Sequence, residues 1–241
     1  MRFLIDRDEA VQITISVVAI SLAMAIVFAQ VDGMVRYPRE FVIFMLPLLV
    51  TVGSGFILHE MAHKLVAIYY GAQAKFRMWT QGLIFMLVTS LFGVLFAAPG
   101  AVYIYSDRIS RRQNGIISLA GPSLNIVLMA VFVLLQVVAP VQQYFSFLAY
   151  WGGHFAGFGI YYGMLNAWQF GAAMNLMLGL FNMIPAFPLD GSKVFAWKKT
   201  VWVLFVVLLL GLGAILIDPG IVISWGIMLL IFGVLSKLLF G

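Results

Sequence analysis

The feature that most constrains this chain is the length of its uncharged apolar stretches. Residues 10–31 and 116–139, for example, contain no Asp, Glu, Lys or Arg. A transmembrane helix needs about 20 predominantly apolar residues, so each stretch is long enough to cross a bilayer. Hydrophobic residues make up 63% of the 241 residues and charged residues only 10%. A soluble globular protein, a disordered chain, a coiled coil and a nucleic-acid-binding module are therefore excluded.

The hydropathy pattern predicts an all-α polytopic membrane protein with about six transmembrane helices. The expected spans are residues 10–31, 41–70, 116–139, 165–184, 201–217 and 221–236. Residues 83–105 are also apolar and long enough to cross, but Gly93 and Pro99 interrupt them, and residues 101–105 are rich in strand-forming side chains. We expect this segment, which follows the second span, to be re-entrant, as either a β hairpin or a helix.

The distribution of positive charge supports this topology. With these spans, 12 of the 14 Lys and Arg residues fall on one side of the membrane, and only Arg36 and Arg39 fall on the other. Cytoplasmic loops carry the excess of Lys and Arg. We therefore expect a multi-pass integral protein of the cell membrane with both termini in the cytoplasm. The net charge of +5 then belongs to loops at the surface of the lipid bilayer, and we expect no nucleic-acid partner.

Of the 9 acidic residues, Glu9 included, all but Glu60 and Asp190 lie at the ends of spans or in turns. A charge near the bilayer centre costs about 2.5–3.5 kcal/mol on insertion scales and indicates a functional role. Glu60 lies in the sequence His59-Glu60-Met-Ala-His63. Residues four apart on a helix share a face, so both imidazoles can reach one ion, and Glu60 lies beside them. This is the H-E-x-x-H pattern of zinc hydrolases, and the alternative is an inert buried polar cluster.

Asp190 is the expected third metal ligand. Pro185 and Pro188 interrupt the helix before it and free backbone groups beside the carboxylate. His59 lies about 27 Å along the second span, near the cytoplasmic leaflet, and Asp190 lies near the cytoplasmic end of a later span. His154 is the rival ligand, but its aromatic loop is expected at the opposite face. The chain contains no Cys, which excludes thiolate ligands.

These motifs resemble those of the site-2 protease family of intramembrane metalloproteases. The resemblance rests on His59-Glu60-Met-Ala-His63, on Gly121-Pro-Ser-Leu-Asn125, and on Asn182-x-x-Pro185-x-x-Pro188-Leu-Asp190-Gly191, in this order. It implies one membrane-embedded metalloprotease core over residues 1–241, without PDZ or CBS domains. It also implies one Zn²⁺ per chain, held by two His and one Asp, with the Glu of the first motif as general base.

The same resemblance implies a zinc endopeptidase of regulated intramembrane proteolysis. Its expected partners are single-pass or other helical membrane proteins, whose peptide bonds it hydrolyses near the cytoplasmic leaflet. A substrate helix must unwind locally before cleavage, and an exposed strand at residues 101–105 could pair with the unwound stretch. Substrate identity and oligomeric state stay open.

Two further residues are candidates for the site. Asn125 is a candidate oxyanion donor, and the alternative is hydrogen bonding between helices beside the small Gly121. Asn182 is a candidate for holding the substrate backbone, and the alternative is capping of the chain near Pro185.

A second class of function also stays open, namely a membrane metal-ion transporter or metal sensor without proteolysis. Glu60 and Asp190 would then be acids of an ion pathway. Transporters usually carry internal repeats, and neither of the two acidic motifs occurs twice in this sequence.

Overall fold

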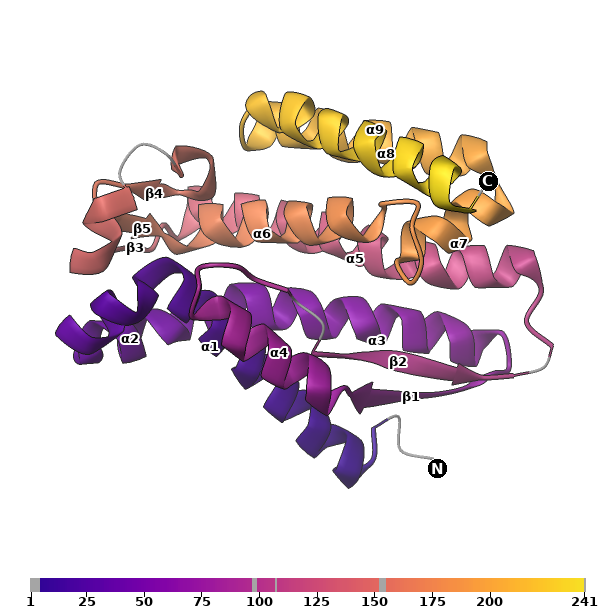
Figure 1. The fold of residues 1–241 in the computed structure, drawn as a ribbon, viewed down its shortest axis with the longest axis horizontal. Helices are drawn as coiled ribbons and strands as arrows, with labels where there is room; N and C mark the ends of the chain where they lie inside the picture. Colours follow the sequence, from indigo (N-terminus) through magenta and orange to yellow (C-terminus); the bar gives the residue numbers. More distant parts are fainter. Residues whose placement is uncertain (1–4, 97–98, 107, 152–154, 241) are drawn as a thin grey trace.

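The computed structural model describes residues 5–96, 99–106, 108–151 and 155–240, with the backbone alone at residue 230 and residues 232–240. Helices make up most of it (Figure 1). The first half contains α1 (Arg7–Arg36), α2 (Pro38–Leu48), the π-helical turn η1 (Leu49–Gly53), α3 (Ser54–Tyr69), β1 (Gln73–Met78), α4 (Thr80–Ser90) and β2 (Gly100–Tyr105). The second half contains α5 (Arg111–Val138), β3 (Gln142–Tyr144), the 3₁₀ turns η2 (Ser146–Trp151) and η3 (Ala156–Phe158), β4 (Ile160–Tyr161), β5 (Met164–Asn166), α6 (Ala167–Asn182), α7 (Asp190–Trp197), α8 (Lys199–Leu216) and α9 (Gly220–Phe240).

Among the residues that the structure describes, four helical stretches are long and apolar enough to cross a membrane, namely Arg7–Arg36, Pro38–Tyr69, Arg111–Val138 and Lys199–Leu216. They cover the first expected span in full, and the second, third and fifth except for one residue at the end of each. At the fourth expected span, α6 has only 16 residues and rises about 24 Å. At the sixth, helix α9 runs from Gly220 to Phe240, and its part with described side chains up to Leu229 is apolar. The count of six spans therefore stays a prediction.

The second candidate span changes its helical pitch just before the H-E-x-x-H motif. Pro47 lies inside the helix and has no N–H to donate. The π-helical turn η1 follows directly and merges into α3. Such π turns inside helices occur frequently at functional sites, and here the turn ends at Gly53, nearly two helical turns before His59.

Residues 83–105 form neither one helix nor a self-contained hairpin. They include most of α4, and they end in β2, which pairs antiparallel with β1 so that Phe76 faces Val102. The sequence did not indicate β1, because Lys75 and Arg77 resemble a cytoplasmic loop. The fold therefore inserts α4 between the two strands of a β1–β2 ribbon. Whether this segment is re-entrant in a bilayer stays a prediction.

Two large apolar clusters and a small third one around Ala67, Ala72 and Ile117 build the interior of the described part of the chain. The first large cluster joins α1, α2, α3, β1 and α4 with residues that follow β3, and the second joins α5, α6, α7, α8 and α9. Helix α3 packs against α5, and α5 packs against α6 and α7, so the clusters meet along these helices. Both ends of the described chain lie at the same end of the bundle as α7 and the start of α5, and the small β3–β5–β4 sheet lies at the opposite end (Figure 1).

Candidate metal centre

Helix α3 presents both imidazoles of the motif to α5. The side chains of His59 and His63 are only 3% and 9% exposed. His59 Nδ1 lies 2.6 Å from the Asn125 amide oxygen, and His63 Nδ1 lies 2.7 Å from the Ile117 carbonyl oxygen. An oxygen of this kind can only accept, so each Nδ1 donates and each Nε2 keeps its lone pair. Both lone pairs are thus available to a common ligand.

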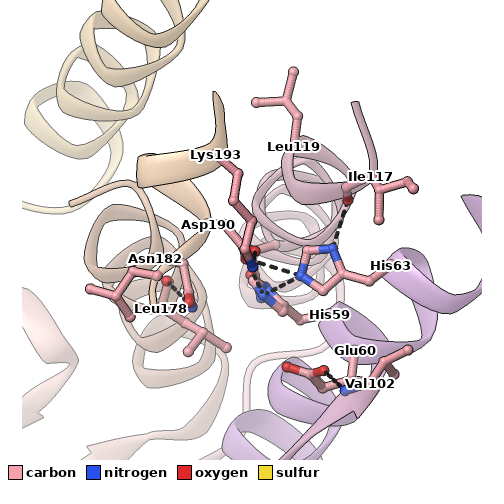
Figure 2. Close-up of polar contacts among 12 residues, drawn as sticks. His59, Glu60, His63, Val102, Ile117, Leu119, Leu178, Asn182, Asp190 and Lys193 are labelled. Atoms are coloured by element: carbon pink, nitrogen blue, oxygen red, sulfur yellow. Dashed lines mark hydrogen bonds and ion pairs between the residues drawn. The ribbon is translucent and has the colours of Figure 1, made fainter. Parts of the chain in front are cut away.

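Asp190, the first residue of α7, completes this group. Its Oδ2 lies 3.0 Å from His63 Nε2 and 3.3 Å from His59 Nε2, and the two Nε2 atoms lie 3.0 Å apart (Figure 2). Ligands at about 2.0–2.1 Å from a tetrahedral zinc ion lie about 3.3 Å from one another. The triangle of donor atoms is close to that size, and its chemistry, two neutral imidazoles and one carboxylate, suits zinc. The residues present therefore fit the metal.

Two glycines allow the close approach that this geometry needs. A Cβ atom on Gly121 of α5 would lie 2.5 Å from the Nε2 atoms of both His59 and His63. A Cβ atom on Gly191 would lie 2.2 Å from the backbone oxygen of Met183, at the end of α6. Gly121 therefore keeps space beside the donor atoms, and Gly191 lets α7 begin against α6.

The Glu60 carboxylate lies beside the triangle, and the residue as a whole is 9% exposed. One carboxylate oxygen lies within 4.8 Å of ring nitrogens of His59 and His63. The backbone N–H of Val102 in β2 donates to Oε2 at 2.8 Å (Figure 2). The β1–β2 ribbon thus holds the carboxylate in a fixed orientation next to the donor atoms.

Comparison with known proteins identifies the family. Residues 47–201 match peptidase family M50, and the match contains all the residues of this site. A Methanocaldococcus jannaschii protein named "Putative zinc metalloprotease MJ0611" is 39% identical over 210 residues, which cover 87% of this chain and 94% of that protein. The chain belongs to peptidase family M50. This confirms the predicted site-2 protease family, and the protein is accordingly a metalloprotease with apolar helices suited to a membrane.

The M50 chain is also similar to a second protein of the same organism, "Zinc metalloprotease MJ0392". The two are 27% identical over 152 residues, which cover 63% of this chain and 34% of that relative. No solved structure matches the chain with significance.

The amide of Asn125 in the M50 chain is already occupied. Its oxygen faces His59 Nδ1, and its nitrogen donates to Asn175 Oδ1 at 3.0 Å and to the Gly55 carbonyl at 3.3 Å. Both amide N–H bonds therefore point to other acceptors, and the predicted oxyanion role would require the side chain to leave these contacts. Asn175, a buried polar residue in the apolar helix α6, was not among the predicted residues, although an Asn inside an apolar span is itself a signal.

Two predicted residues remain, and neither belongs to the donor triangle. Asn182 is the last residue of α6, and its amide donates to the Leu178 carbonyl at 3.0 Å, within its own helix. Its predicted contact with substrate backbone stays a prediction. His154 lies outside the described residues.

Two cavities are lined by residues close to Asp190 in the sequence. The first, of about 540 Å³, is polar and is lined in part by Ile104, Arg111 and Lys193. The second, of about 470 Å³, is mostly apolar and is lined by residues of α1, η1, α3, α6 and α9, together with Leu95, Phe96 and Leu189. The donor residues themselves line neither cavity, but Lys193 and Leu189, close to Asp190 in the sequence, line the first and the second, respectively.

Proposed function

We propose that this M50 protein is an intramembrane zinc endopeptidase that hydrolyses peptide bonds of transmembrane-helix substrates near the cytoplasmic leaflet. The observation that carries the proposal is the convergence of His59 Nε2, His63 Nε2 and Asp190 Oδ2 within 3.0–3.3 Å of one another. These residues come from α3 and α7, and they would hold one zinc ion per chain. Glu60 would be the general base.

The chemistry follows from the positions of these groups. When bound, zinc supplies Lewis acidity, which polarises the scissile carbonyl and lowers the pKa of a water ligand to about 7. Glu60 accepts a proton from the attacking water and returns it to the leaving amine. Asn125 and the Ile117 carbonyl accept the Nδ1–H bonds and thereby orient the two imidazoles. In this proposal Asn125 is a positioning residue for His59.

The two cavities support a substrate that passes from the bilayer to water. Apolar side chains of a transmembrane helix suit the cavity between α1, α3 and α6, whereas the polar cavity admits water and the cytoplasmic continuation of the substrate. The substrates would be single-pass or other helical membrane proteins. Both ends of the described chain lie at the same end of the bundle as α7, which supports two cytoplasmic termini in a multi-pass arrangement.

The outer edge of β2 offers a place for an unwound substrate strand. Phe76 and Val102 face each other across the ribbon, and their N–H groups point outward, to side chains on α1 and α3. Outward and inward groups alternate along an antiparallel pair. The N–H of Ile104 therefore also points to the outer edge of β2, where Ile104 lines the polar cavity. A substrate strand added here would run past Glu60.

Substitution of Ile104 by proline tests this strand addition. It removes one outward N–H without removing a hydrogen bond to β1, and loss of one backbone hydrogen bond is expected to slow cleavage of a transmembrane substrate by about 5- to 10-fold. The matched control is Ala74→Pro, since Ala74 faces Ile104 and its N–H points to the opposite edge. Cleavage rates in proteoliposomes are the measurement. Equal rates for both variants would exclude pairing at this edge.

The proposed activity is tested directly with purified full-length protein in proteoliposomes that contain a single-pass substrate. We expect zinc-dependent cleavage within or next to the transmembrane helix, detected by mass spectrometry of the products. Metal analysis should give one zinc per wild-type chain and a strongly reduced content for Asp190→Ala. Transmembrane flux of Zn²⁺ without any cleavage would instead identify a transporter and overturn the proposal.

A further inference from the structure

Glu9 and Lys64 form an ion pair in the interior, outside the donor triangle. Their side chains are 2% and 3% exposed, and Lys64 Nζ lies 2.5 and 2.6 Å from the two Glu9 oxygens. The backbone N–H of Phe76 in β1 donates to the same carboxylate at 2.8 Å. Buried ion pairs carry a large desolvation penalty and rarely improve stability over an apolar pair, so a buried pair calls for another explanation. Here one carboxylate joins α1, α3 and β1.

The Glu9–Lys64 pair belongs to a closed ring of contacts that also includes Glu60. Lys64 follows Glu60 by four residues, so the two side chains share a face of α3. Lys64 binds Glu9, and Glu9 accepts from Phe76 N–H. Phe76 faces Val102 across the ribbon, and Val102 N–H returns to the Glu60 carboxylate at 2.8 Å. The position of Val102 relative to Glu60 thus depends on how Glu9 links α3 to β1.

Helix α1 continues this link along the outer edge of β1. Gln12 Oε1 accepts from Met78 N–H at 3.0 Å, and Ser16 Oγ donates to the Pro99 carbonyl at 3.1 Å. Glu9, Gln12 and Ser16 lie on one face of α1. Their side chains bind backbone groups of the ribbon that a further strand would otherwise pair with. Apolar contacts alone would let the ribbon slide, whereas these directional bonds fix its register against α1 and α3.

The neighbouring ion pairs at the surface differ from this one. Lys75 Nζ lies 2.6 Å from Asp6, a contact that lowers the pKa of the Asp6 carboxyl and raises the pKa of Lys75. Arg77 lies 2.9 Å from Asp8. The side chains of these partners are 28–62% exposed, and ion pairs at the surface contribute little to stability. They make Asp8→Asn a suitable control for loss of a nearby charge pair.

We propose that Glu9 and Lys64 are positioning residues for the general base. They hold the β1–β2 ribbon at a fixed distance from α3, so that Val102 N–H keeps the Glu60 carboxylate beside the donor triangle. This inference rests on the proposed function, because the position of Glu60 matters only if it takes part in hydrolysis. The function of the pair is therefore catalytic alignment rather than stability.

The test compares Glu9→Gln, Lys64→Met and the double variant in full-length protein. Each single variant leaves one buried charge without its partner, so both should unfold at lower temperature than the wild type. The double variant leaves no such charge, and its thermal stability should recover. The Gln amide oxygen can still accept from Phe76 N–H, but a Met side chain has no donor, so the link between α3 and β1 is lost in both variants that carry Lys64→Met. In the double variant kcat should therefore stay about tenfold below the wild type, with KM and zinc content unchanged.

Two controls separate alignment from stability. Asp8→Asn removes a charge pair at the same end of the bundle, and Glu40→Gln changes a carboxylate that accepts from Ser146 N and Oγ far from the site. Both should keep the wild-type kcat. Recovery of kcat together with stability in the double variant would overturn the inference. The proposed function is judged separately, by the rate of Glu60→Gln, so either idea can fail alone.

Discussion

Replacement of Gly121 by alanine is expected to abolish both zinc binding and peptidase activity without unfolding the protein. The added Cβ would lie 2.5 Å from the Nε2 atoms of His59 and His63, which is closer than nonbonded atoms approach. The rings must turn away, or the methyl group fills the space beside the donor triangle. Loss of the metal removes several kcal/mol of transition-state stabilisation, so the cleavage rate should fall by at least about 1,000-fold.

This loss cannot be attributed to the helix itself, because alanine in a helix interior is more favourable than glycine by about 1 kcal/mol. Gly179→Ala is the matched control. A Cβ atom there would meet Leu209 and Asn125 at 3.5 and 3.8 Å, which are ordinary contacts. That variant should keep wild-type zinc content and cleavage. Metal analysis, cleavage rates and thermal unfolding of both variants are the measurements, and full zinc content in Gly121→Ala would contradict the described convergence of the imidazoles.

The sequence could predict the donor triangle because helical spacing and depth along each span determine where its three residues lie. His59 and His63 share a face by helical spacing, and the depth of each motif in its span brings Asp190 to the same level. The structure brings these three residues together as that argument requires. The orienting partners were harder to find. The Ile117 acceptor is a backbone carbonyl, which no side-chain pattern reveals, and the role of Asn125 depends on the direction of its amide.

The β1–β2 ribbon and the burial of Glu9 could not be predicted from the sequence, for a different reason. Glu9 belongs to a charged run at the start of α1, and such runs usually face water or lipid headgroups. Its burial results from Lys64, 55 residues away, and from the N–H of Phe76, 67 residues away. Charged residues in β1 likewise prevent its prediction as a strand from the sequence. The N–H groups of Phe76 and Met78 in this strand donate to side chains of α1. Tertiary partners, and not local propensity, decide both features.

Replacement of Glu60, the proposed general base, should also have a large effect on cleavage. Glu60→Gln is expected to reduce the cleavage rate by about 100- to 10,000-fold, the usual contribution of a positioned acid–base group. The amide has the shape of the carboxylate, and its oxygen can still accept from Val102 N–H, so the ribbon should stay in place. It cannot accept the proton of the attacking water. Because the three donor atoms are unchanged, zinc content should remain that of the wild type, as measured by metal analysis beside the cleavage assay.

Comparison with Asp190→Ala separates a base from a ligand. That variant should lose zinc and cleavage together, whereas Glu60→Gln should lose cleavage alone. This comparison is needed because a Glu60 oxygen lies within 4.8 Å of the imidazole nitrogens, which is close enough for Glu60 to bind the metal directly. Loss of zinc from Glu60→Gln would make Glu60 a ligand. Cleavage by Glu60→Gln within a few-fold of the wild type would remove the general base from the mechanism and with it the proposed peptidase chemistry.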